Sequence, residues 1–317
     1  FSQDASGLIA VRLTGPEGPY VLYARTLVLA TGIEGNGKRH IPSMIGPDVP
    51  KDLYAHTQDD ISFDTLKGKK VLVLGGGASA YDNAIKAAQA GADTHIFHRM
   101  KELISVNPGT WGEFSGYIAH YADLPPEKKW LFAKTTGTIK GGPPVATLRL
   151  AKSLPNLTIH PGEGWNTVSH DGGKLTVTTP EGVYEADFLI LGTGYTLDLT
   201  AVPSLADKLD EIAVWADMFE PPADLPGNGL ERAPWLEKDF TFCPKPGMAR
   251  TWHDQVFNFA RGAQLSMGLL SIGLSGIRYG IDRLSSSVEC RLFLQDSSTY
   301  LRGLESWKTR DLSALDT

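Results

Sequence analysis

A glycine-rich loop between an apolar strand and a helix constrains this chain more than any other feature of its sequence. Residues 71–74 form an apolar run, residues 75–80 read Gly-Gly-Gly-Ala-Ser-Ala, and residues 81–90 have the composition of a helix that Gly91 ends. The loop has the spacing G-x-G-x-x-A, in the strand-to-helix context that gives this motif its meaning. The segment therefore predicts a dinucleotide-binding βαβ unit, and the alternative is a glycine-rich turn that holds no ligand.

Each residue type in this loop has a physical role. Gly75 permits a tight turn, Gly77 lets the backbone approach a pyrophosphate, and Ala80 allows close packing of the helix on the strand. The helix N-terminus offers free N–H groups and the positive end of its dipole to an anion. Ser79, at the helix start, is expected either to bind a phosphate or to cap the helix.

The end of the next strand indicates which dinucleotide is bound. Sites specific for NAD place Asp or Glu there, to bind the ribose 2′-hydroxyl, whereas an Arg accommodates a 2′-phosphate. Here the strand at 94–98 runs into His98-Arg99-Met100-Lys101. We therefore expect NADP(H), with Arg99 on the 2′-phosphate and His98 or Lys101 assisting. The alternative is that Arg99 and Lys101 are solvated loop charges.

Two distant stretches of the chain repeat one plan. In each, a hairpin is followed by an Ala-Arg or Ala-Asp step and then by an apolar strand that ends in Thr-Gly, at residues 24–32 and again at 186–194. Continuous apolar runs are typical of buried parallel strands, and a final glycine lets a ligand or another backbone approach. The repetition predicts two dinucleotide-binding folds, each finished by a strand that reaches its cofactor. Because the sequence contains one glycine-rich loop, the first fold is expected to lack its opening βαβ unit.

Composition narrows the function classes. With 42% hydrophobic and 21% charged residues, the 317-residue chain has the make-up of a soluble α/β protein, and its net charge of −6 argues against a general nucleic-acid binder. The two cysteines, Cys243 and Cys290, have no CxxC spacing, which excludes a dithiol centre or a zinc site built from them. The apolar stretch between Arg261 and Arg278 is shorter than the ~20 residues that a membrane span needs. We expect a cytoplasmic protein without a metal, a membrane contact or a nucleic-acid partner.

The order of these motifs resembles that of the flavoproteins with two dinucleotide-binding domains. The resemblance is specifically to the NADPH-dependent flavin monooxygenases of the flavin-containing, Baeyer–Villiger and N-hydroxylating types. It is carried by Ala30-Thr31-Gly32, His56-Thr57, the loop at 75–80, Arg99 and Leu191-Gly192-Thr193-Gly194-Tyr195. The chain departs from the Baeyer–Villiger fingerprint, because Asp52 stands four residues before His56 where a glycine is expected.

The C-terminal part of the chain extends the resemblance. Residues 255–266 and 275–280 are similar to the segment that, in these families, passes the flavin ring and returns to the FAD domain as a helix. The resemblance therefore places Gln264 and Leu265 at the flavin. Gly276 and Gly280, four residues apart, are expected to give the helix a flat face for close packing.

The resemblance implies FAD and NADP(H) as cofactors and a small organic molecule with O₂ as substrates. NADPH would reduce the flavin by hydride transfer, and oxygen would pass from a flavin C4a-(hydro)peroxide to the substrate. A protein nucleophile is not required, and the sequence shows neither G-x-S-x-G nor H-E-x-x-H, so no catalytic residue is assigned. The alternatives are a flavoprotein reductase or oxidase without oxygen transfer, and a non-catalytic NADP-binding fragment of a longer flavoenzyme. A homo-oligomer stays open.

The predicted architecture is an α/β fold with two Rossmann-like domains, in which the NADPH-binding domain is inserted into a partial FAD-binding domain. We assign 1–50 and 240–317 to the FAD-binding part, 51–195 to the NADPH-binding domain, and 196–239 to a variable lid or contact segment. The residues expected at the cofactors are Ala30, Thr31, Gly32, His56, Gly75, Gly76, Gly77, Ala78, Ser79, Ala80, His98, Arg99, Lys101, Thr193, Gly194, Tyr195, Gln264 and Leu265.

Overall fold

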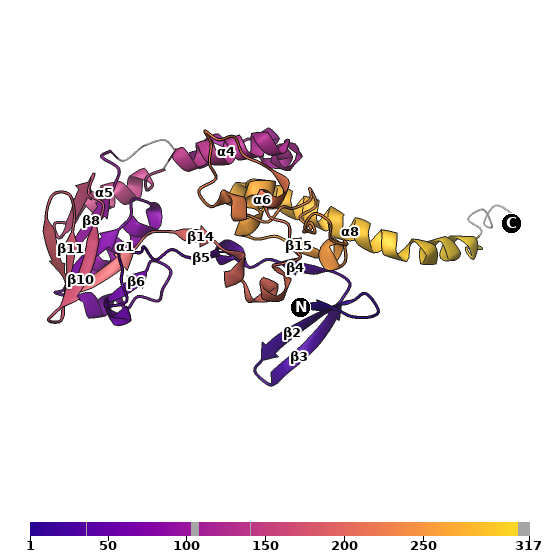
Figure 1. Ribbon diagram of the computed structural model, residues 1–317, viewed down its shortest axis with the longest axis horizontal. Coiled ribbons are helices and arrows are strands. Elements are labelled where there is room, and N and C mark those ends of the chain that lie inside the picture. The colour runs from indigo at the N-terminus through magenta and orange to yellow at the C-terminus, as the bar shows by residue number, and fades with distance from the viewer. Residues whose placement is uncertain (36, 103–107, 140, 310–317) are drawn as a thin grey trace, which may run out of the picture.

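A computed structural model describes residues 1–35, 37–102, 108–139 and 141–309. Figure 1 shows two lobes joined by a narrow link. We call them the sheet lobe, built on a parallel sheet, and the helical lobe, built around the long helix α8 (Leu274–Glu305). The link is a two-stranded antiparallel ribbon of β5 (Gly37–Arg39) and β14 (Tyr195–Leu197).

The sheet lobe contains a five-stranded parallel sheet in the order β6-β13-β7-β8-β9. One face is covered by α1 and α5, and the other by the antiparallel sheet β10-β11-β12. Val71 and Val73 pack under the helices while Leu72 and Leu74 pack under the antiparallel sheet, which is why this strand is apolar at every position. The bounds are β6 (Tyr54–His56), β7 (Lys70–Leu74), α1 (Ala78–Gln89), β8 (Asp93–His98), α5 (Val145–Ser153), β9 (Leu157–Pro161), β10 (Thr167–Asp171), β11 (Lys174–Thr178), β12 (Val183–Ala186) and β13 (Phe188–Leu191).

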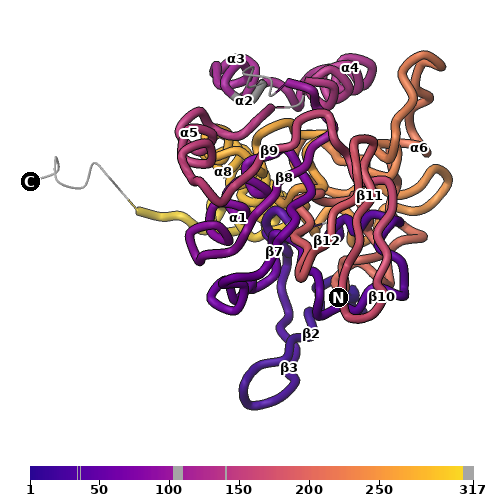
Figure 2. Tube along the Cα trace, turned by 90° about the vertical axis from the view of Figure 1, so that its left-hand side faces the viewer, coloured from indigo at the N-terminus to yellow at the C-terminus, as the bar shows by residue number. Residues whose placement is uncertain are grey.

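The repeated plan predicted from the sequence is present. The antiparallel strands β1 (Ser2–Gln3), β2 (Ile9–Gly15) and β3 (Gly18–Ala24) precede β4 (Leu27–Leu29), just as β10, β11 and β12 precede β13. β4 pairs in parallel with β15 (Val256–Asn258), 229 residues later at each paired position, as in Leu27 with Val256 and Val28 with Phe257. Figures 1 and 2 both show β2 and β3 as a hairpin that projects away from the lobes. The α/β fold class is confirmed.

The helical lobe has its own apolar core, which includes the fully buried rings of Phe240, Phe242 and Phe257. Helix α8 lies close to this core because Gly276 and Gly280 are buried in its face. A Cβ at Gly276 would clash with the carbonyl oxygen of Leu269, and one at Gly280 with that of Leu270. The predicted flat face is therefore confirmed. Within the described residues, no helix has both the length and the apolarity to cross a membrane.

Two segments of the chain, one with residues 115–138 and the other with residues 196–239, pack on the helical lobe. α3 (Ser115–His120) contributes Ile118 to the core around Phe240, and α4 (Pro126–Thr138) places Trp130 against Trp215 of α6 (Trp215–Met218). The short helix α2 (Pro108–Trp111) precedes them, and α7 (Gln264–Met267) contacts α4. The segment at 196–239 adds Leu199 and Leu205 to the same core. Both segments thus help to build the helical lobe, although α3 and α4 fall in the range 51–195, which we assigned from the sequence to the NADPH-binding domain.

Candidate functional site

The glycine-rich loop leaves open space in front of α1. Gly77 is the N-cap residue of this helix, with φ −87° and ψ 173°, and a Cβ placed there would meet no atom within 4 Å. The N–H groups of the first helical turn have no partner within the helix. This arrangement fits a phosphate group, because the backbone can approach an anion here without a side chain in between.

Behind the loop, the backbone is packed tightly. Gly75 has φ +142°, and a Cβ on it would clash with the carbonyl oxygen of Gly192. A Cβ on Gly192 would lie 2.5 Å from the Cβ of Ala80, which is itself 1% exposed. Gly75, Ala80 and Gly192 therefore bring α1 close to the ends of β7 and β13, and only very small residues fit at these positions.

The basic residues after β8 differ in accessibility. The stem of Arg99 lies over Gly164, where a Cβ would be 2.6 Å from its Cγ, and the side chain is exposed. Within the described part of the chain, neither Arg99 nor Lys101 has an ion-pair or hydrogen-bond partner for its charged group. Both charged groups are therefore available to an anionic ligand.

His98, by contrast, is buried in the protein interior. It is 3% exposed, its Nδ1 lies 2.8 Å from the carbonyl oxygen of Met100, and its Nε2 lies 3.3 Å from the hydroxyl of Tyr81. Burial lowers the pKa of His98, which favours the neutral ring. His98 thus supports the turn, and of the two residues expected to assist Arg99 only Lys101 is accessible.

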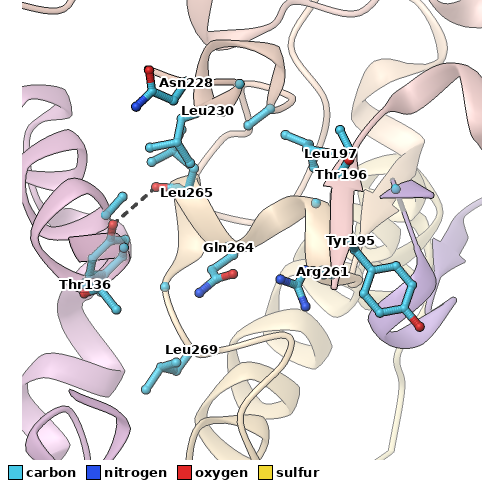
Figure 3. A pocket seen from close by; sticks show the side chains of 18 of the residues that line it. Thr136, Tyr195, Thr196, Leu197, Asn228, Leu230, Arg261, Gln264, Leu265 and Leu269 are labelled. Atoms are coloured by element: carbon cyan, nitrogen blue, oxygen red, sulfur yellow. Dashed lines mark hydrogen bonds between the residues drawn. The ribbon is translucent and has the colours of Figure 1, made fainter. Parts of the chain in front are cut away.

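A cavity of about 570 Å³ lies between the helical lobe and the link (Figure 3). This volume is typical of small-molecule sites. Of the residues expected at the cofactors, Thr193, Tyr195, Gln264 and Leu265 line it. On the other side of the cavity, α3 adds Tyr117, the turn after α3 adds Tyr121, and α4 adds Thr136. The glycine-rich loop, Arg99, Lys101 and the first Thr-Gly strand end lie outside this lining.

His56 and Gly194 hold the link in place. His56 is 1% exposed, and its Nε2 donates a hydrogen bond to the carbonyl oxygen of Gly194 over 3.0 Å. The backbone N–H of His40 donates to the same oxygen over 2.9 Å, and Gly194 takes φ +74°. The ring of His56 also meets that of Tyr195 edge to face, with centroids 5.7 Å apart. His56 thus ties β6 to β14 and does not line the cavity.

The first Thr-Gly strand end has two features that leave room for a further group. Gly32, just after β4, has φ +71° with open space where a Cβ would be. Beside β4, the buried side-chain amide of Asn258 has neither its nitrogen nor its oxygen hydrogen-bonded within the described residues. Such an orphaned amide is the kind of group that a bound molecule or a further strand satisfies. Ala30 and Thr31 lie at the same strand end.

Comparison with known proteins gives one strong sequence match. Over 276 residues, the chain is 34% identical to the FAD-dependent urate hydroxylase of Xanthomonas campestris; the match covers 87% of this chain and 58% of that protein. In sequence, the chain therefore resembles a flavin-dependent hydroxylase. A family model for pyridine nucleotide-disulphide oxidoreductases also matches residues 13–118 of the chain.

Solved structures show the same fold at lower identity. The ornithine hydroxylase of Pseudomonas aeruginosa is 15% identical with a TM-score of 0.63, over 90% of this chain and 67% of that one. The ornithine N-hydroxylase of Kutzneria sp. 744 is 17% identical with a TM-score of 0.61, over 90% of this chain and 68% of that one. The chain spans 58% of the length of the urate hydroxylase that it matches.

The two cysteines of the chain lie in different surroundings. Cys243 is buried, and burial raises its pKa to about 12, whereas Cys290 is exposed on α8. Both residues lie in the described part of the chain, where they form no thiol pair. The chain itself therefore offers no dithiol for disulphide exchange.

Sequence reasoning missed part of the cavity wall. Arg261, Trp111, Tyr117 and Tyr121 all line it. The aromatic spacing in 111–121 is equally typical of a core, so the rings gave no separate signal. Arg261 stands at the start of a long apolar stretch. This isolated charge was the one feature of the sequence that could have pointed to a site there.

Proposed function

We propose that this chain forms the NADP(H)-binding lobe and the substrate-facing wall of an FAD- and NADPH-dependent monooxygenase. The cavity carries the proposal, because the second Thr-Gly strand end and the 264–265 segment meet there. The related urate hydroxylase is FAD-dependent by name, and the Kutzneria enzyme was solved with reduced FAD, NADP⁺ and L-ornithine. A small organic substrate in the same cavity accounts for its size.

The proposed roles of the residues follow from their places. Gly77 and the first turn of α1 would hold the NADP(H) pyrophosphate, and Arg99 with Lys101 the 2′-phosphate. Ala30, Thr31 and Gly32 would face FAD from the first strand end, and Gln264 and Leu265 from the cavity. Bound FAD supplies hydride acceptance and reaction with O₂, while the chain orients the reactants and excludes water.

Product analysis tests oxygen transfer. We expect the chain, supplied with FAD, to show a bound-flavin absorbance and to consume NADPH with formation of an oxygenated product. The candidate substrates should include urate, amines and sulfides, with H₂O₂ measured in parallel. Release of H₂O₂ equal to the NADPH consumed with every candidate would contradict the proposal and favour an oxidase.

Replacing Arg99 by Ala tests the choice of dinucleotide. A charge-assisted contact to the 2′-phosphate is worth about 1.5–3 kcal/mol, so the Kd for NADPH should rise about tenfold or more. The Kd for NADH, which lacks this phosphate, should stay unchanged. Isothermal titration with both dinucleotides measures the effect, and Arg149→Ala on the exposed face of α5 is the matched control. Equal losses for the two dinucleotides would exclude the 2′-phosphate contact.

A further inference from the structure

We propose that Arg261 is the anion-binding side chain of the cavity, and that the substrate is an anion on a flat ring system, such as an aromatic carboxylate. The inference rests on the proposed function, because it takes the cavity as the substrate site. It goes further in naming the charge and shape of the molecule that enters. The argument has three steps, concerning charge, desolvation and shape.

Arg261 is the dominant charge of the cavity. Among the described residues that line it, Arg261 is the only Lys or Arg, and none is Asp or Glu. Figure 3 shows its guanidinium beside Gln264, with the polar end toward the open space. The cavity therefore has a positive field with no acidic wall to balance it.

Arg261 also has no anionic partner in the described part of the chain. Its guanidinium lies over the ring of Tyr195, whose centroid is 5.6 Å from the guanidinium carbon. Burial lowers the pKa of Arg261, although a guanidinium stays protonated in proteins. A cation that loses water without gaining an acid is unfavourable, and a cation–π contact offsets only part of that. An anionic ligand would complete the pairing, and the planar guanidinium suits a carboxylate.

The rings in the wall indicate the shape of the ligand. Trp111 and Tyr117 meet edge to face with centroids 5.4 Å apart, and Tyr117 meets Tyr121 in the same way at 5.4 Å. The hydroxyl of Tyr121 donates to the carbonyl oxygen of Lys129 over 3.0 Å, so this ring is held in place by α4. Fixed aromatic rings favour stacking or edge contacts with another ring. Asn228 and Gln264 add polar groups for orientation.

A cofactor phosphate is the other possible source of the anion. The glycine-rich loop and Arg99, which are proposed to hold the NADP(H) phosphates, lie outside the lining of the cavity. The NADP(H) phosphates are therefore not the anion that pairs with Arg261. FAD, which is proposed to lie at Gln264 and Leu265, is a further source of anionic groups, and we assign the anion at Arg261 to the substrate because the cavity is proposed as the substrate site. The experiment below separates the substrate from the dinucleotide, because the substrate probe and the dinucleotide are titrated independently.

The test compares two probes of nearly equal size and shape, one anionic and one neutral. Indole-3-carboxylate and the neutral indole-3-carboxamide are titrated calorimetrically into the 317-residue chain, into Arg261→Met and into Arg261→Lys. The chain should bind the carboxylate about tenfold tighter than the carboxamide. Arg261→Met keeps the apolar stem and should bring this ratio to about one, whereas Arg261→Lys keeps the charge without the planar guanidinium and should retain part of the preference. Arg12→Met removes an exposed charge on β2 and should leave the ratio unchanged.

Several outcomes overturn the inference. These are equal affinity of the native chain for the two probes, no binding of either at millimolar concentration, and an unchanged ratio in Arg261→Met. Loss of NADP⁺ affinity in Arg261→Met with an unchanged carboxylate preference would assign Arg261 to the cofactor. Failure of the proposed function itself would appear elsewhere, as normal probe binding without NADPH-dependent oxygenation.

Discussion

Substitution of Gly77 by Asp is expected to abolish NADPH binding while leaving the chain at least as stable as before. Gly77 is the N-cap residue of α1 in an extended conformation, and its missing Cβ faces open space. Asp is a better N-cap residue than Gly, by a few tenths of a kcal/mol, so the helix should gain stability. The carboxylate would, however, occupy the place proposed for the pyrophosphate and repel it. We expect the Kd for NADPH to rise about 100-fold or more.

The neutral variant Gly77→Asn is the control for this experiment. Asn caps a helix as well as Asp and has nearly the same size, but it carries no charge. It should weaken NADPH binding far less than Asp does, with a similar gain in thermal stability. If both variants bind NADPH with native affinity, the dinucleotide does not lie against Gly77, and the proposed role of the loop fails.

The loop and its sheet were predictable because their signals are local. The glycines at 75 and 77 act through their own backbone angles and the space beside them, and the apolar run at 71–74 reflects burial on both faces. The repeated plan was predictable for the same reason, since each hairpin directly precedes its strand. Where the neighbours in space are also neighbours in sequence, residue patterns carry the structural information.

The cavity was not predictable because its walls come from distant segments. Tyr117, Thr136, Asn228 and Arg261 meet there only after α3 and α4 pack on the helical lobe. The direction of a single side chain has the same difficulty. The sequence position of His98 suggests a residue that assists Arg99. Its ring instead points into the interior, where it contacts the hydroxyl of Tyr81 and the carbonyl oxygen of Met100. Residue type and spacing do not determine such contacts.

Substitution of Gly75 by Ala should strongly destabilise the sheet lobe, although it adds one methyl group. The residue takes φ +142°, a region that costs a non-glycine residue about 1–3 kcal/mol. The new Cβ would also clash with the carbonyl oxygen of Gly192, on the strand next to β7, and overpacking of this kind costs about 1–3 kcal/mol more. Urea unfolding should therefore show a loss of about 3 kcal/mol or more, with hydrogen exchange accelerated in β7 and β13.

A second glycine separates strain from crowding. Gly173, in the turn between β10 and β11, has φ +87° but no atom within 4 Å of its would-be Cβ. Gly173→Ala should therefore lose only the conformational part, about 1–2 kcal/mol. The difference between the two losses in the free energy of unfolding gives the cost of the clash with Gly192, which follows β13. Equal losses would mean that Gly192 moves aside without cost. The close packing of α1, β7 and β13 would then not limit which residue fits at position 75.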